Sequence, residues 1–169
     1  MIDGTRAADA AAFREAMSLF PSGVVIVTTR GPNGLPRGFT ASSFCSVSTD
    51  PPLVLVCLAN SAESHEAFSH CAEFAVSVLG PQHQAVAERF ATRGADKFRG
   101  DDLTLTPDRL HTVTGALSVL RCRAYDRHLA GDHTILVGRV TQVDLGRGTP
   151  LVYVRRSFHS LADTPAPGR

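Results

Sequence analysis

The sequence predicts a mainly β domain in which helices flank a closed antiparallel barrel. Two observations favour this class: the expected strands outnumber the expected helices, and at least two strand connections have hairpin chemistry. A third is the run at residues 53–58, which is apolar on both faces of an extended chain. Such a strand must be covered on both sides, by a closed barrel with helices or by a second subunit. A parallel α/β sheet is therefore less favoured.

The composition is that of an ordinary globular protein. The 169 residues fit a single domain (1–169), and we expect an ordered core over about 10–160 between flexible ends. A net charge of +1 without a basic stripe argues against nucleic acid as a partner. No apolar run reaches the ~20 residues of a membrane span, and no signal-peptide pattern begins the chain, so we expect a cytoplasmic protein. Four cysteines without a CxxC pair predict reduced, buried thiols.

A helix is expected near the N-terminus. Asp9 can cap it, and it should extend over residues 10–19. Phe13, Met17 and Phe20 are spaced by four and three residues, which places them on one face. We expect this apolar stripe to belong to the core rather than to a cofactor site.

A hairpin should follow the helix. The β-branched run at 24–29 predicts a buried strand, and the Gly-Pro-Asn-Gly turn at 31–34 folds it back onto a strand over 37–49. At Ser43 and Phe44 the alternation of polar and apolar residues reverses, which predicts a β-bulge, a feature often found beside active sites. The alternative is an edge strand with a serine-rich solvent face. The hydroxyls of the polar face belong to Thr40, Ser42, Ser46 and Ser48.

The remaining elements are expected in the order strand, helix, strand, helix and three strands. Their predicted ranges are 53–58, a helix from a cap at Asn60 or Ser61 to about 70, 74–79, a helix over 82–92, 115–125, 133–145 and 151–155. Val86 and Phe90 should face the core from the second of these helices, which Pro81 starts. We expect residues 95–112 to be irregular and 163–169 to be a disordered tail.

Several catalytic motifs are absent from the sequence. It contains no GxGxxG dinucleotide motif after a strand, no P-loop and no G-x-S-x-G nucleophile motif. His65 and His70 are five residues apart, so on a helix they would point roughly 140° apart and could not share a metal ion. No metal site is predicted.

Four weaker features could each meet a polar ligand. They are the hydroxyl strand with Gly38, the helix start at 60–64, the cations Arg89, Arg93 and Lys97, and Gly131-Asp132-His133 at the mouth of a hairpin. Glycine permits close backbone approach, and a helix start favours an anion. Each feature also has a structural alternative: a solvent face, a helix cap, a charged surface or a turn histidine.

Taken together and in order, these features resemble the flavin reductase-like family. Its members are small NAD(P)H:flavin oxidoreductases that serve as reductase components of two-component monooxygenases. The resemblance covers about residues 13–158. The matching segments are 20–24, 38–44 with 46–48, 51–53, 74–79, 89–91, 97–98 and 131–133.

This resemblance implies a fold and a set of ligands. The fold would be an FMN-binding split β-barrel, six-stranded, antiparallel and Greek-key, acting as a homodimer with flavin near the subunit interface. The ligands would be FMN or FAD, with NADH or NADPH as co-substrate, and a separate monooxygenase would receive the reduced flavin.

The resemblance also implies site residues. The flavin would be bound by Arg37, Gly38, Phe39, Thr40, Ser42, Ser43, Leu58, Ala59, Asn60, Ser64, Arg89, Phe90 and Lys97. Of these, Arg89 and Lys97 would meet the phosphate. The nicotinamide side would be formed by His133, the expected catalytic residue, with Tyr153 and Arg156.

The sequence departs from the family pattern at Ser77, at Arg127-His128 and over 153–158. It does not choose between FMN and FAD or between NADH and NADPH. Two other functions stay open: a non-catalytic flavin-binding barrel, and a flavoprotein that retains FMN and reduces an organic substrate directly. In a flavin reductase the hydride passes between the two cofactors, and the protein mainly binds and orients them. A sequence that shows neither an acid–base pair nor a metal site is therefore consistent with this function.

Overall fold

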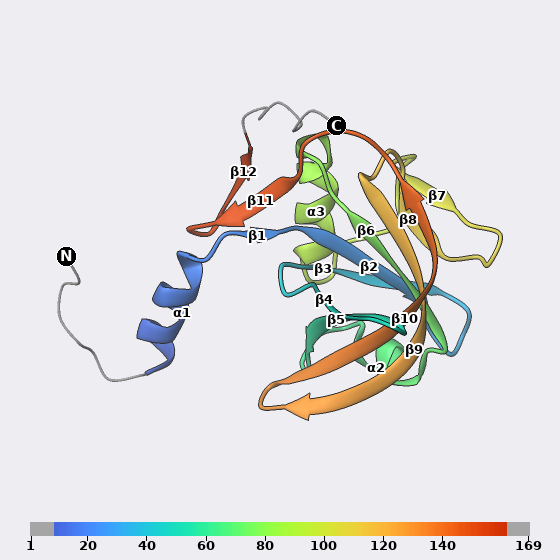
Figure 1. Cartoon of the computed structure of the whole chain (residues 1–169), viewed down its shortest axis with the longest axis horizontal. Helices are drawn as coiled ribbons and strands as arrows, with labels where there is room; N and C mark the ends of the chain where they lie inside the picture. The colour runs from blue at the N-terminus through green and yellow to red at the C-terminus, as the bar shows by residue number, and fades with distance from the viewer. Residues whose placement is uncertain (1–8, 162–169) are drawn as a thin grey trace.

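The structure, a computed structural model, describes residues 9–161 (Figure 1). Its centre is a seven-stranded antiparallel sheet in the order β3-β2-β6-β9-β10-β5-β4. The strands are β2 (Val25–Arg30), β3 (Pro36–Ala41), β4 (Cys45–Thr49), β5 (Pro52–Ala59), β6 (Glu73–Val78), β9 (Ser118–Ala130) and β10 (His133–Leu145). The expected class, mainly β with flanking helices, is confirmed. The sheet has one strand more than the six implied by the resemblance.

Smaller elements surround this sheet. A three-stranded sheet joins β1 (Ser22–Gly23), β11 (Leu151–Val154) and β12 (Ser157–Ser160), and β7 (Leu103–Leu105) pairs with β8 (His111–Val113). The helices are α1 (Ala10–Ser18), α2 (His65–His70), the 3-10 turn η1 (Pro81–His83) and α3 (Gln84–Ala91). None of these helices, all within residues 9–161, is long and apolar enough to cross a membrane. The β7–β8 hairpin, in a segment expected to be irregular, and β12 were not predicted.

The single strand expected over 37–49 is wrong, because the chain forms two strands there. β3 pairs with β2 and β4 pairs with β5, so they lie at opposite edges of the sheet. Ser42, Ser43 and Phe44 cross between the edges, with Phe44 against the core and both serines exposed. The reversed alternation therefore marks a strand break and not a bulge. The register shift in this region lies between Ser46 and Ser48. Because β3 and β4 share no ladder, the sheet does not close within residues 9–161, and the expected closed barrel is not formed there.

The core follows the inward face of this sheet. In β5, Val54, Val56 and Leu58 are buried, whereas Leu53 and Leu55 on the other face are only partly buried. Both faces of this strand were expected to be covered, but within residues 9–161 only the face with Val54, Val56 and Leu58 is fully buried. Phe39 of β3 packs edge-to-face on Phe68 of α2, with ring centroids 5.0 Å apart.

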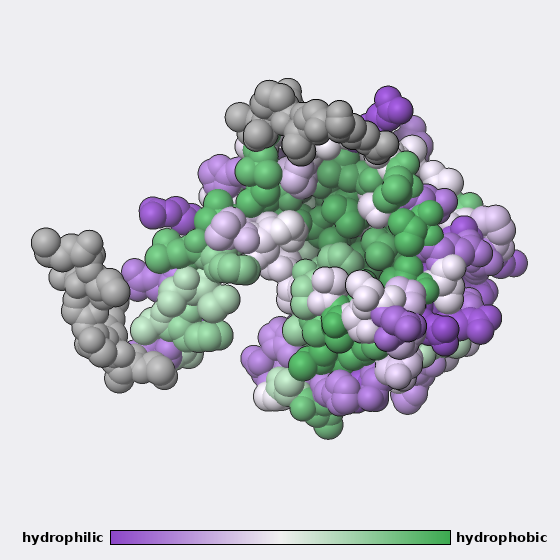
Figure 2. Space-filling view, in the orientation of Figure 1, coloured by the Kyte–Doolittle hydropathy of each residue, from purple (hydrophilic) through white to green (hydrophobic). Residues whose placement is uncertain are grey.

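Helix α1 begins where predicted but does not enter the core. The Asp9 carboxylate accepts hydrogen bonds from the amides of Ala11 and Ala12 and so caps the helix. Phe13, Met17 and Phe20 are nevertheless 63%, 51% and 65% exposed, so the predicted core stripe is wrong. The helix stands away from the sheet, and apolar surface remains open on it (Figures 1 and 2). The spacing of these residues places them on one side as predicted, but nothing within residues 9–161 covers them.

The cysteines are free, but only one is deeply buried. Burial raises the pKa of the Cys122 thiol to about 12. Cys45 is exposed, and Cys57 and Cys71 are partly buried, so the expectation of buried thiols is wrong for these three. Within residues 9–161 no group of three or more His, Cys, Asp and Glu could hold a metal ion. The flexible ends predicted for the chain lie outside the described residues.

Candidate functional site

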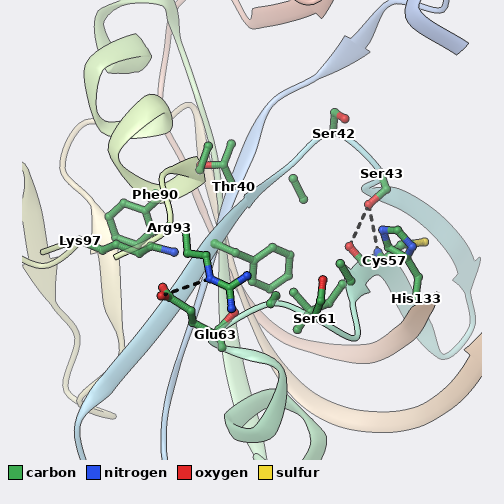
Figure 3. Close-up of a pocket in the computed structure, with 17 residues that line it drawn as sticks. Thr40, Ser42, Ser43, Cys57, Ser61, Glu63, Phe90, Arg93, Lys97 and His133 are labelled. Atoms are coloured by element: carbon green, nitrogen blue, oxygen red, sulfur yellow. Dashed lines mark hydrogen bonds and ion pairs between the residues drawn. The ribbon is translucent and has the colours of Figure 1, made fainter. Parts of the chain in front are cut away.

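A cavity of about 440 Å³, the first cavity, lies between β3, β5, α3 and the start of β10 (Figure 3). It brings together ten of the predicted site residues: Phe39, Thr40, Ser42, Ser43, Leu58, Ala59, Ser64, Phe90, Lys97 and His133. It also contains residues that were not assigned to the site: Ala41, Cys57, Ser61, Ala62, Glu63, Ala91 and Arg93. Most of the residues predicted to bind flavin therefore line the same cavity.

The hydroxyl wall of this cavity is partly structural. The Thr40 hydroxyl donates to the Ala87 carbonyl at 2.6 Å and fastens β3 to α3. The Ser43 oxygen accepts from the Cys57 amide at 3.0 Å and donates to the Cys57 carbonyl at 3.3 Å, which ties the crossing segment to β5. The Ser42 hydroxyl has no hydrogen-bond partner within residues 9–161 and can face a ligand.

Charged side chains gather at one end of the first cavity, where Lys97, Arg93 and Glu63 point toward one another (Figure 3). The Lys97 amine donates to the Gly38 carbonyl at 3.4 Å. Partial burial lowers the pKa of Lys97, and the Glu63 carboxylate acts in the opposite direction. The Arg93 Nε lies 3.8 Å from a Glu63 oxygen. Two cations at one end make this part of the cavity suitable for a ligand phosphate.

His133 lies at the other end of the first cavity, beside Ser43 and Cys57 (Figure 3). Its Nδ1 is 2.7 Å from the Asp132 carboxylate, and this hydrogen bond lowers the pKa of Asp132. With Nδ1–H donating to the carboxylate, Nε2 is left for a ligand.

Asn60, whose predicted contact with flavin stays a prediction, fixes a turn. Its amide N–H donates to the Asp132 carbonyl at 2.9 Å, and its side-chain amide donates to the Gly131 carbonyl at 3.4 Å. Asn60 does not line the first cavity, and it does not cap α2, whose N-cap is Ser64. These contacts place Asn60 behind the turn that presents His133.

Arg89 is also outside the first cavity. Its guanidinium holds both Asp102 oxygens, at 2.6 and 2.8 Å, and its Nε donates to the Lys97 carbonyl at 3.2 Å. The phosphate role of Arg89 stays a prediction. Its contacts indicate that Arg89 positions the segment that carries Lys97, while Arg93, just after the end of α3, lines the cavity.

Arg37 and Gly38 line a third cavity of about 350 Å³, which shares Glu63, Ser64 and Lys97 with the first. At Gly38 a Cβ would stand 2.7 Å from the Phe90 ring and 2.9 Å from the Val27 carbonyl. The absence of a side chain at Gly38 therefore allows Phe90 of α3 to pack closely on β3, and the predicted contact of Gly38 with flavin stays a prediction.

A second cavity of about 680 Å³ adjoins the first and shares Thr40, Ala41, Ser42 and Ala91 with it. Tyr153, Phe158 and Arg156 line it, together with Gln84 and Glu88 of α3. The centroids of the Tyr153 and Phe158 rings lie 5.1 Å apart. The predicted nicotinamide side is therefore divided, with His133 in the first cavity and Tyr153 and Arg156 in the second.

Two departures from the family pattern have structural roles. The buried Ser77 hydroxyl accepts a hydrogen bond from the Val113 amide at 3.1 Å and so anchors β8. The Arg127 Nε donates to the Phe68 carbonyl at 2.9 Å, and its guanidinium also bonds the Cys71 carbonyl, which holds the end of α2. Neither residue lines the first or second cavity.

Comparisons with known proteins agree with this geometry. Residues 17–162 match the flavin reductase like domain. The actinorhodin polyketide dimerase of Streptomyces coelicolor is 48% identical over 92% of this chain and 88% of its own length. The NADH:riboflavin 5'-phosphate oxidoreductase of Streptomyces pristinaespiralis is 42% identical over the same shares.

A solved structure extends the comparison to the fold. The Streptomyces globisporus C-1027 NADH:FAD oxidoreductase, in complex with NAD and FAD fragments, superposes with a TM-score of 0.88 and 32% identity. The match covers 95% of this chain and 98% of that one. The family model alone spans most of the sequence printed here. The chain belongs to the flavin reductase-like domain family.

Proposed function

We propose that this protein is an NAD(P)H:flavin oxidoreductase that transfers a hydride from the nicotinamide to FMN or FAD and supplies the reduced flavin to a separate monooxygenase. The observation that carries this proposal is a pair of adjoining cavities for two ligands. The first has a hydroxyl wall between a cationic end and an imidazole. The second shares that wall and has two aromatic rings.

The residues present fit a flavin. Lys97 and Arg93 would receive the phosphate, and the free Ser42 hydroxyl and the segment around Ser43 would lie along the ring. When bound, the flavin supplies the hydride acceptor, so the protein needs no acid–base pair of its own. The role of His133 is then to orient the nicotinamide through Nε2, with its ring fixed by Asp132 and the turn that Asn60 clamps. Tyr153 and Arg156 would receive the rest of the dinucleotide.

The names of relatives support both substrates. One is an NADH:riboflavin 5'-phosphate oxidoreductase, and another is the reductase component of 4-hydroxyphenylacetate 3-monooxygenase from Thermus thermophilus. These names favour NADH over NADPH for this chain and a flavin-dependent monooxygenase as its partner. A cytoplasmic location stays a prediction.

The direct test is to mix the purified chain with each pairing of FMN or FAD with NADH or NADPH and to follow the absorbance of the reduced nicotinamide. The expected result is flavin-dependent oxidation, fastest with NADH, with flavin turned over many times per protein. Absence of oxidation with every pairing would reject the reductase and leave the non-catalytic flavin-binding barrel.

A second candidate is a flavoprotein that keeps its flavin and acts directly on an organic substrate. The relative named a polyketide dimerase and the aromatic second cavity favour it. It would retain flavin through gel filtration and reduce free flavin poorly. Release of flavin on the column together with rapid turnover of free flavin would exclude it.

The exposed stripe on α1 supports a homodimer. Phe13 and Met17 of α1 and Phe20 just after it are exposed apolar side chains of the kind that a partner surface covers, and the outer residues Leu53 and Leu55 of β5 are incompletely covered. We expect a second copy of the chain to cover them. Light scattering should give twice the mass of the chain, and Met17→Glu should shift it toward one chain. A wild-type protein that is a monomer at every concentration would contradict the dimer.

The pKa of Lys97 gives a pH prediction. Because burial lowers that pKa below the ordinary value of 10.5, Lys97, the only lysine of the sequence, loses its charge at a lower pH than a fully exposed lysine would. A phosphate dianion, present above about pH 7, needs the charged amine. The FMN dissociation constant should therefore increase in alkaline solution before ordinary lysines titrate, and more than that of riboflavin. Parallel loss of both ligands would show that Lys97 does not meet the phosphate.

A further inference from the structure

A carboxylate stands at the cationic end of the first cavity. Glu63 lines this cavity together with Arg93 and Lys97, and the three side chains converge in Figure 3. One Glu63 oxygen lies 3.8 Å from the Arg93 Nε, and the charge of Glu63 acts to raise the pKa of Lys97. The same carboxylate therefore interacts with both cations that a ligand phosphate would use.

The backbone holds this carboxylate in place. The Gly94 N–H donates to both Glu63 oxygens, at 3.1 and 3.2 Å. Gly94 follows α3 with a φ of 74°, a conformation that suits glycine, and its N–H reaches Glu63 in the segment between β5 and α2. The Glu63 side chain is 44% exposed, so solvent screens its charge in part but does not remove it.

A bound phosphate would then share its cations with a fixed negative charge. Repulsion between the carboxylate and a phosphate dianion opposes binding, and the Arg93–Glu63 ion pair must weaken when Arg93 turns to the phosphate. We propose that Glu63 limits the affinity for phosphorylated flavin, by competing with the phosphate for Arg93 and Lys97, and so favours release of the reduced product. This inference rests on the proposed function.

The alternative role of Glu63 is purely structural, as an anchor for the end of α3. Glu63→Gln separates the two roles, because the amide oxygen still accepts from the Gly94 N–H but carries no charge. Riboflavin separates them a second time, since it has the ring and ribityl chain of FMN without the phosphate. An effect of charge has to appear with FMN and not with riboflavin.

The experiment measures dissociation constants by quenching of flavin fluorescence for FMN and riboflavin. Removing one charge next to a phosphate should lower the FMN constant of Glu63→Gln about tenfold and slow FMN release by a similar factor, because affinity changes appear mostly in the off-rate. Riboflavin binding should stay within about twofold, the scatter expected of a surface substitution. Glu66→Gln, which removes an equal charge from the exposed face of α2 outside the first cavity, is the matched control and should change neither ligand.

Arg93→Gln provides a second test. An arginine released from Glu63 should contribute more to phosphate binding, so Arg93→Gln should cost more FMN affinity in the Glu63→Gln background than in the wild type. Unchanged or weaker FMN binding by Glu63→Gln, or equal tightening of FMN and riboflavin, would overturn the inference. If wild-type protein binds neither flavin, the proposed function fails and the inference fails with it.

Discussion

Replacing Gly138 with alanine is expected to lower the free energy of unfolding by about 3 kcal/mol, at the upper end of the usual cost of overpacking a core. Gly138 lies buried in β10, where a Cβ would stand 2.9 Å from the Phe74 Cε1, closer still to its Cζ, and 3.0 Å from the Cys122 Cβ. Phe74 is only 2% exposed, so its ring has no open space to enter. Denaturant titration measures the loss.

Gly23→Ala is the matched control, because no atom lies within 4 Å of the Cβ that it would add. Its stability should stay close to that of the wild type. Shortening the ring should relieve the clash, so Gly138→Ala should cost less in a Phe74→Leu background than alone. If Gly138→Ala were as stable as Gly23→Ala, the close packing of β10 on Phe74 would be wrong.

Replacing His133 with alanine is expected to lower kcat/KM for NADH about tenfold, the value of about one hydrogen bond to the ligand. FMN affinity should change little, because His133 lies at the end of the first cavity opposite Lys97 and Arg93. Steady-state rates with varied NADH, together with FMN titration of the same variant, separate the two effects.

His128→Ala is the control for His133. His128 also pairs with a nearby carboxylate, with Nε2 3.2 Å from Asp126, but it does not line the first or second cavity. This variant should keep wild-type kinetics. Asp132→Asn retains the imidazole and should lose less activity than His133→Ala. Loss of FMN affinity in His133→Ala, with an unchanged response to NADH, would instead place His133 on the flavin.

Local signals in the sequence predicted much of the fold. The turn at 31–34 forms the β2–β3 hairpin, and Pro81 opens the η1–α3 segment that buries Val86 and Phe90. Both depend on turn and cap chemistry within a few residues, which a sequence displays directly.

Features that depend on contacts between distant parts of the chain could not be predicted from such local signals. The reversed alternation at 42–44 indicated that the strand is irregular there. Only the pairing of β3 with β2 and of β4 with β5 shows that the strand ends and a new one begins. The spacing of Phe13, Met17 and Phe20 predicted an apolar face, but it could not show that this face lies outside the core. The short β12 follows a two-residue turn with Arg155 and Arg156 at positive φ, which the sequence does not signal because glycine or asparagine is usual there.

The site shows the same limit. Order along the chain identified Lys97 and His133, which the structure brings into one cavity. It could not choose between Arg89 and Arg93, which are four residues apart, because the choice depends on where α3 ends, on how it docks and on Asp102. In the sequence, Glu63 is only one residue of a predicted helix start. Its carboxylate is seen to line the cavity only once the structure places it beside Arg93 and Gly94.

The crystal structure of the FMN complex tests the assignment of the first cavity most directly. The expected result is density for the ring beside Ser42 and Ser43, with the phosphate within hydrogen-bonding distance of Lys97 or Arg93. A flavin seated between Tyr153 and Phe158, or a phosphate bound away from both cations, would contradict it.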